Sequence, residues 1–88
     1  MTGTCQVRTG QVVKSKAGRD QDQFFVVLDI VDEQYLMLVD GRRRTLSHPK
    51  KKKFKHVAFT KTFVEFPEEN HLFNDSYIRK QLSPFQEA

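Results

Sequence analysis

The sequence predicts an all-β fold: a small barrel of about five short strands, followed by a short C-terminal helix. Two observations indicate this fold. Short runs rich in Val, Phe, Leu and Ile recur between residues 10 and 62, and turns containing Gly, Asp or Pro separate them. Short strands joined by tight turns are typical of a small barrel or a curled sheet.

The chain has 88 residues, which is enough for one domain with a small core. We expect a tail at residues 1–9, the barrel at 10–62, and an extension at 63–88 that carries the helix.

The first two expected strands flank a polar loop. Residues 10–15 form the first strand, and the loop at 16–22 contains Gly18, which can adopt the positive φ of a tight turn. The second strand, 24–31, is the most apolar run of the chain. Its even positions form a core face: Phe24, Val26, Leu28 and Ile30. Its odd positions are mixed, which indicates burial on much of both faces.

The next two strands are expected as a hairpin. Residues 34–39 alternate as a strand, and Asp40-Gly41 follows directly. This dipeptide favours a type I′ turn, in which both central residues need positive φ. The returning strand would cover 43–47 and end before Pro49, because proline has no N–H to donate to a sheet ladder.

A lysine-rich loop and a fifth strand complete the expected barrel. Residues 50–53 are all lysine, and we expect them in an exposed loop. Residues 56–62 alternate again, with Val57 and Phe59 on one side, and form the fifth strand.

The C-terminal helix is expected at about residues 75–82, with Asn74 as its N-cap and Pro84 as its stop. Charged side chains suit the two ends of the helix dipole: Asp75, Arg79 and Lys80. The buried stripe would consist of Tyr77, Ile78 and Leu82.

Cys5 is the only cysteine, so an intramolecular disulfide is impossible and a reducing compartment fits. It lies in a polar segment with no base nearby, so we do not expect a nucleophile. The apolar runs are much shorter than the roughly 20 residues that a helix needs to cross a bilayer. We therefore expect a cytoplasmic protein without membrane association.

Positive charge is concentrated between residues 42 and 56. This segment holds more than half of the chain's 15 Lys and Arg residues and no acid. Its basic residues are Arg42, Arg43, Arg44, Lys50, Lys51, Lys52, Lys53 and Lys55. Like charges held together repel one another, whereas on a polyanion each neutralised phosphate releases a counterion. The alternatives are a solvated charge run, arginines that keep a sheet edge soluble, and a nuclear-import signal.

Residues 10–31 resemble the KOW motif, which consists of a strand, a loop with a key glycine, and a second strand. The matching positions are Gly10, Val12, Val13, Gly18, Asp20 and residues 24–30. The segment is similar to the KOW motif of small ribosomal-type proteins, namely archaeal and eukaryotic large-subunit proteins and their short bacterial relatives.

The resemblance continues through most of residues 10–82. Short bacterial relatives also have an Asp-Gly turn, a proline before a lysine run, and a C-terminal Asn-Asp helix, as at Asp40-Gly41, 49–57 and 74–82 here. The resemblance implies an SH3-like barrel that binds RNA. In the family the motif loop often faces nucleic acid, which would add Lys14, Lys16 and Arg19 to the contacts; as isolated residues they are equally ordinary surface charges.

We therefore expect a non-catalytic RNA-binding protein, associated with the ribosome through ribosomal RNA and monomeric when free. The three histidines lack a second ligand at zinc-like spacing, so neither a metal nor another cofactor is expected. No catalytic motif indicates an enzyme. Phe54 and Tyr35 either stack on an unpaired base or belong to the core, and the core reading is favoured.

The alternative function is a protein-interaction module of the transcription or translation machinery, which would bind ribosomal or transcription proteins. Apolar residues beside the helix would then matter most: Phe63, Phe66, Leu72 and Phe73. An anionic membrane surface is a third option, but the chain lacks an amphipathic anchor.

Overall fold

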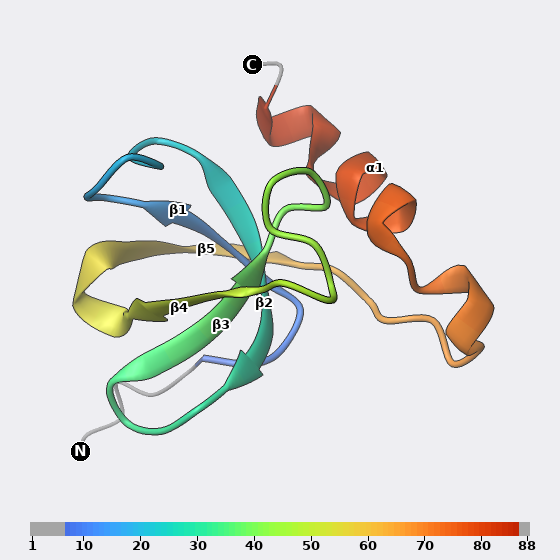
Figure 1. Cartoon of the computed structure of the whole chain (residues 1–88), viewed down its shortest axis with the longest axis horizontal. Coiled ribbons are helices and arrows are strands. Elements are labelled where there is room, and N and C mark those ends of the chain that lie inside the picture. The colour runs from blue at the N-terminus through green and yellow to red at the C-terminus, as the bar shows by residue number, and fades with distance from the viewer. Residues whose placement is uncertain (1–6, 87–88) are drawn as a thin grey trace.

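The computed structural model describes residues 7–86. Cys5 and most of the expected N-terminal tail lie outside the described residues. Five antiparallel strands and one C-terminal helix make up the fold (Figure 1). The strands are β1 (Gln11–Ser15), β2 (Phe24–Ile30), β3 (Tyr35–Val39), β4 (Lys50–Lys53) and β5 (Val57–Phe63).

The sheet is open. Its strand order is β4-β3-β2-β1-β5, and within residues 7–86 the edge strands β4 and β5 do not pair with each other. The expected closure of the barrel is therefore wrong. β4 has only four residues, and the chain then turns through a short 3-10 helix, η1 (Phe54–His56), before β5 begins on the opposite edge. This turn carries the backbone away from the ladder before a further pair can form.

Both faces of the sheet are buried, as the mixed pattern of β2 predicts. Phe25 and Val27 pack on one face into the inner cluster. Val26 packs on the other face into the helix-side cluster. The inner cluster consists of Val13, Phe25, Val27, Leu36, Leu38 and Val57, with Phe54 packed against it. The helix-side cluster consists of Val12, Val26, Val39, Val64, Ile78 and Leu82.

One expected core position is exposed instead. Ile30 is 38% exposed. The pairing of β2 with β3 shifts register between Val27 and Asp29, so the alternation that identifies a core face does not continue unchanged to Ile30.

The expected hairpin at Asp40-Gly41 is wrong. Gly41 has φ of 80°, but Asp40 does not have positive φ, so the pair does not form a type I′ turn. The segment 40–49 is a loop, and the strand that pairs with β3 is β4, the run expected to be an exposed loop. Pro49 therefore precedes a strand rather than ending one.

The C-terminal helix, α1 (Asp75–Gln86), follows a short 3-10 helix, η2 (Asn70–Leu72). The Asn74 side chain accepts a hydrogen bond from the Tyr77 N–H at 2.9 Å, which confirms the N-cap. Ile78 and Leu82 are buried, as expected, and Tyr77 is half-buried.

The helix runs past its expected stop, because Pro84 lies inside it. Proline removes one helical hydrogen bond, but the last turn is held by tertiary contacts. The Phe85 and Phe24 rings are 5.2 Å apart, and the Gln86 side chain donates to the Phe24 carbonyl at 3.4 Å. The longer helix also leaves Arg79 away from its C-terminus, so the expected match with the helix dipole is wrong at that end.

Candidate nucleic-acid interface

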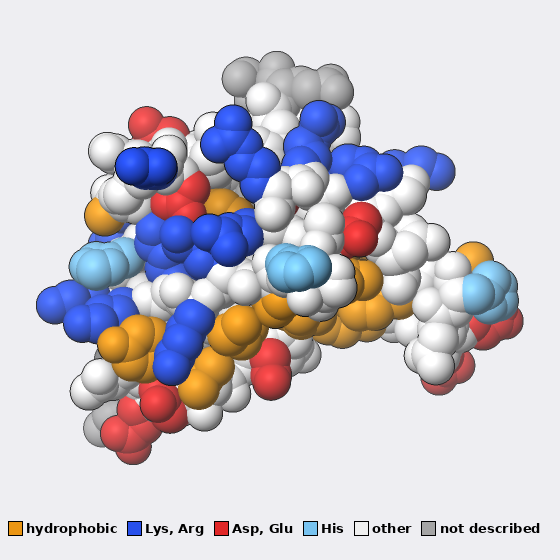
Figure 2. Space-filling view, viewed as in Figure 1, with side chains coloured by type: hydrophobic (Ala, Val, Ile, Leu, Met, Phe, Trp, Pro, Cys, Tyr) orange, Lys and Arg blue, Asp and Glu red, His pale blue; other side chains and the backbone are white. Residues whose placement is uncertain are grey.

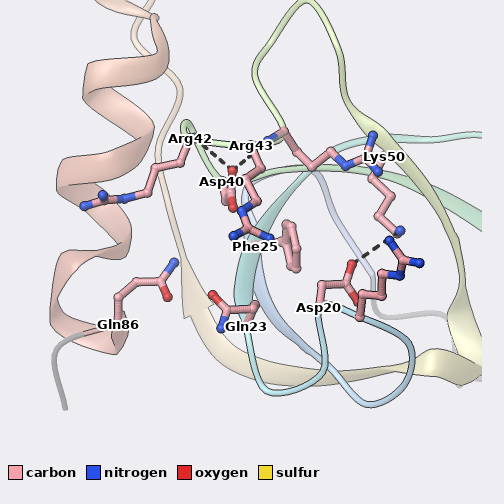
Figure 3. A pocket seen from close by; sticks show the side chains of 10 residues that line it. Asp20, Gln23, Phe25, Asp40, Arg42, Arg43, Lys50 and Gln86 are labelled. Atoms are coloured by element: carbon pink, nitrogen blue, oxygen red, sulfur yellow. Dashed lines mark hydrogen bonds and ion pairs between the residues drawn. The ribbon is translucent and has the colours of Figure 1, made fainter.

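A broad groove opens between the loop at 16–23, the loop at 40–49 and the end of α1 (Figure 3). Its volume is about 720 Å³. The residues that line it come from two loops, two strands and the helix: Arg19, Asp20, Gln23, Phe25, Asp40, Arg42, Arg43, Arg44, Lys50 and Gln86.

The Asp40 carboxylate shapes the loop that bears the three arginines. Its Oδ1 accepts hydrogen bonds from the backbone N–H groups of Arg42 and Arg44, both at 2.9 Å. The Asp40 N–H in turn donates to the Arg44 carbonyl at 2.9 Å. An aspartate that binds its own following backbone closes a turn and diverts those N–H groups from a sheet ladder. This explains why 43–47 is a loop and not a strand.

Helix α1 also forms hydrogen bonds with the backbone of the same loop. Arg79 donates from Nη1 to the Gly41 carbonyl at 2.6 Å, and the Asp75 carboxylate accepts from the Leu46 N–H at 2.8 Å. The packing is tight, since a Cβ built on Gly41 would lie 2.5 Å from the Asp75 carbonyl oxygen. The helix therefore fixes the position of the arginine loop.

On the opposite wall, a partly buried charge network involves Asp20. Lys52 donates from Nζ to Asp20 Oδ1 at 2.8 Å and to the Ala17 carbonyl at 2.7 Å. The Ser15 hydroxyl also donates to Asp20 Oδ1 at 2.8 Å, and Lys50 Nζ lies 3.5 Å from Oδ2. Burial acts to raise the pKa of Asp20, but the hydrogen bonds from Lys52 and Ser15 and the two lysine charges outweigh burial and lower this pKa.

Alternation along β4 divides the four lysines between two faces. Lys50 and Lys52 lie on the face that meets Asp20, and Lys52 is only 7% exposed. Lys51 and Lys53 lie on the other face, with their Nζ atoms 4.6 Å and 5.9 Å from the centre of the Tyr35 ring. The lysine run is therefore not one uniform cationic loop.

The structure brings together five of the eleven basic residues expected to bind RNA: Arg19, Arg42, Arg43, Arg44 and Lys50. The other six do not line the groove: Lys14, Lys16, Lys51, Lys52, Lys53 and Lys55. Lys52 forms an ion pair with Asp20, and Lys14 lies 3.7 Å from Asp22 in an exposed ion pair. Lys16, Lys51 and Lys55 are exposed outside the groove.

Sequence reasoning did not assign five residues of the groove to the site: Asp20, Gln23, Phe25, Asp40 and Gln86. Asp20 was matched only to the KOW motif. Gln23 and Phe25 flank the predicted start of β2, so their nearness to Arg19 could have been inferred from the loop. Asp40 was assigned to a turn, and its buried carboxylate gave no local signal. Gln86 lies beyond the predicted end of the helix, and only its tertiary packing places it here.

The electrostatics of the groove favour an anion. Five cationic side chains and two carboxylates line it, which gives a formal charge of +3. Within residues 7–86, the four guanidinium groups at Arg19 and residues 42–44 make no ion pair or side-chain hydrogen bond. Figure 2 shows Lys and Arg side chains over the upper and left parts of this face, above a band of hydrophobic side chains.

No group of three or more His, Cys, Asp or Glu side chains in the described part of the chain is placed to hold a metal ion. Among residues 7–86, no helix has the length and apolar character needed to cross a membrane. No protein-family model matches the chain, and neither does any curated protein.

Proposed function

We propose that this chain is a non-catalytic RNA-binding protein whose contact surface is the groove and its basic rim. One observation carries the proposal: four guanidinium groups without a partner among residues 7–86 surround a single groove beside Lys50. Arginines left unpaired around one hollow are mutually repulsive, and an incoming phosphate relieves this repulsion. Guanidinium also forms forked hydrogen bonds with phosphate and stacks on bases.

The rigid placement of the arginines supports this function. Asp40 and α1 fix the backbone of the arginine loop, so binding does not have to order that backbone. Phosphate contacts supply affinity without a choice of sequence. Selectivity would come mainly from RNA shape, because side chains cannot read the deep, narrow major groove of A-form RNA.

We extend the proposal to the KOW type of SH3-like fold and to ribosomal RNA in the cytoplasm as the partner. The first and last strands, β1 and β5, lie side by side in an antiparallel five-stranded sheet. Gly18, the key glycine of the motif, has φ of 87° in the loop between β1 and β2. Both features are compatible with that fold type.

The test is binding to a structured RNA across a salt series. With roughly five phosphate contacts, the plot of log K against log salt should have a slope of about −3.5 to −4.5. The double variant Arg42→Glu/Arg43→Glu should weaken binding by at least about tenfold and reduce the slope by about 1.4 to 1.8, because two contacts are lost.

A matched control is Lys61→Glu/Lys80→Glu, which changes the net charge equally at exposed positions outside the groove. This control should keep most of the affinity at 0.15 M salt, where the Debye length is about 8 Å. Equal weakening of the two variants would mean that net charge, and not the groove, governs binding. Absence of wild-type binding at low salt would refute the proposed function.

The protein-interaction alternative has weaker support. Phe66 and Phe73 have ring centres 4.6 Å apart and pack against the helix-side cluster, so they contribute to the core. Phe63 and Leu72 remain 38% and 49% exposed. An apolar interface through these two residues would bind its partner with little salt dependence, which the salt series separates from RNA binding.

A further inference from the structure

The groove has a cationic rim and a floor of different chemistry. Figure 3 shows Phe25 near the centre of the groove, with Gln23 and Asp20 beside it and Gln86 on the side of the helix. The floor, formed by Asp20, Gln23, Phe25 and Gln86, therefore offers one carboxylate, two carboxamides and a nearly buried phenyl ring. Asp40 belongs to the arginine loop, and from this loop the Arg43 guanidinium reaches inward beside Phe25 (Figure 3).

The floor is unsuited to a phosphate. Asp20 keeps its negative charge, because Lys52 and Ser15 donate hydrogen bonds to it and Lys50 lies close. A carboxylate repels phosphate but accepts hydrogen bonds from N–H groups. Phe25 is only 2% exposed, so it provides a small apolar contact and not a stacking surface.

Two carboxamides add groups that both donate and accept. The Gln23 side chain is exposed and has no hydrogen-bond partner within residues 7–86. Gln86 comes from the last turn of α1 and donates to the Phe24 carbonyl at 3.4 Å, a long bond that a ligand can replace. The edge of a nucleobase, with its alternating donors and acceptors, matches this combination.

The volume of about 720 Å³ is larger than a lone phosphate needs and lies within the range of about 300–1,000 Å³ typical of small-ligand sites. A base inside a duplex cannot enter such a groove, because its edge is paired and its faces are stacked. An unpaired base enters at a lower cost, since little pairing or stacking has to be broken.

We propose that the groove takes one unpaired nucleotide, extruded from a structured RNA, with its phosphates at the arginine rim and its base on the floor near Gln23 and Asp20. The inference rests on the proposed RNA-binding function and specifies the ligand of the same site. A base rich in N–H donors suits the acceptors of the floor, so guanine is favoured over uracil.

The experiment compares four RNA hairpins that differ at one position: fully paired, a single guanosine bulge, a single uridine bulge, and an abasic bulge. We expect the guanosine bulge to bind about tenfold more tightly than the paired hairpin, as two hydrogen bonds would provide. The abasic bulge controls for backbone flexibility and should bind about as weakly as the paired hairpin.

The substitution Gln23→Ala should remove most of the preference for guanosine, while Gln34→Ala, the same change at an exposed turn outside the groove, should retain it. Equal wild-type affinity for all four hairpins would overturn this inference and leave RNA binding intact. A preference that survives Gln23→Ala, or that the abasic bulge reproduces, would also overturn it. Failure of every hairpin to bind at low salt would refute the proposed function itself.

Discussion

The buried lysine of β4 provides a direct test of how the fold uses its charges. Lys52 is 7% exposed and donates to Asp20 at 2.8 Å and to the Ala17 carbonyl at 2.7 Å. The substitution Lys52→Met keeps an unbranched side chain of similar volume, so it removes the charge and the donors with little change in packing. The carboxylate of Asp20 would remain, with Lys50 as its nearest cation at 3.5 Å.

Breaking a buried ion pair on one side costs about 3–5 kcal/mol. Because the Asp20 side chain is 17% exposed and Lys50 compensates in part, we expect Lys52→Met to reduce the free energy of unfolding by about 2–3 kcal/mol. Domains have about 0.05–0.15 kcal/mol of stability per residue, so this loss is a large part of the total. Urea unfolding should show a midpoint lower by about 1–2 M, with an unchanged m-value.

The neighbouring lysine is the matched control. Lys51→Met removes only an exposed ammonium group 4.6 Å from the centre of the Tyr35 ring, which is worth less than about 1 kcal/mol. In addition, Asp20→Asn combined with Lys52→Met should cost less than the sum of the two single changes, because the double variant buries no uncompensated charge. Equal stability of Lys52→Met and Lys51→Met would refute the assignment of Lys52 to a structural ion pair.

Three further changes test other parts of the structure. The lowered pKa of Asp20 stabilises the fold at pH values above the unfolded-state pKa near 3.9. This stability should be lost as pH falls through the lower pKa of the folded state. Urea unfolding midpoints below pH 4 should therefore fall more for the wild type than for Asp20→Asn. Gly41→Ala should lose about 2 kcal/mol or more of stability in thermal unfolding, because its Cβ would lie 2.5 Å from the Asp75 carbonyl oxygen at a φ of 80°. Gly18→Ala should lose only about 1 kcal/mol, because Gly18 has a φ of 87° but no neighbour closer than 3.5 Å. Equal losses for the two variants would contradict this packing. Asn74→Ala should lose about 1 kcal/mol through the N-cap, and an unchanged melting temperature would show that the cap contributes nothing.

The sequence by itself determined most of the elements. Alternating apolar residues placed β1, β2, β3 and β5 within one or two residues of their observed bounds, since the two-residue period of a strand depends only on local order. Asn74 marked the start of α1 because an N-cap is a bond between near neighbours. Gly18 marked its turn because positive φ is a property of one residue.

Tertiary structure decided the role of each charge. Lys52 is a buried structural residue because Asp20, 32 residues away in sequence, lies opposite it, and no local pattern distinguishes it from its three lysine neighbours. The Asp40-Gly41 dipeptide favours a hairpin locally, but the Asp40 carboxylate binds the following backbone and α1 packs on Gly41. The helix likewise passes Pro84 because Phe85 packs on Phe24.

The candidate site shows the same division. The sequence identified a basic segment but not which of its residues converge. Arg19 joins the arginine loop only because the antiparallel sheet brings both loops to one end, and Gln86 joins them only because α1 packs across that end. Contacts between residues distant in sequence depend on the packing of whole elements, which local residue patterns do not contain.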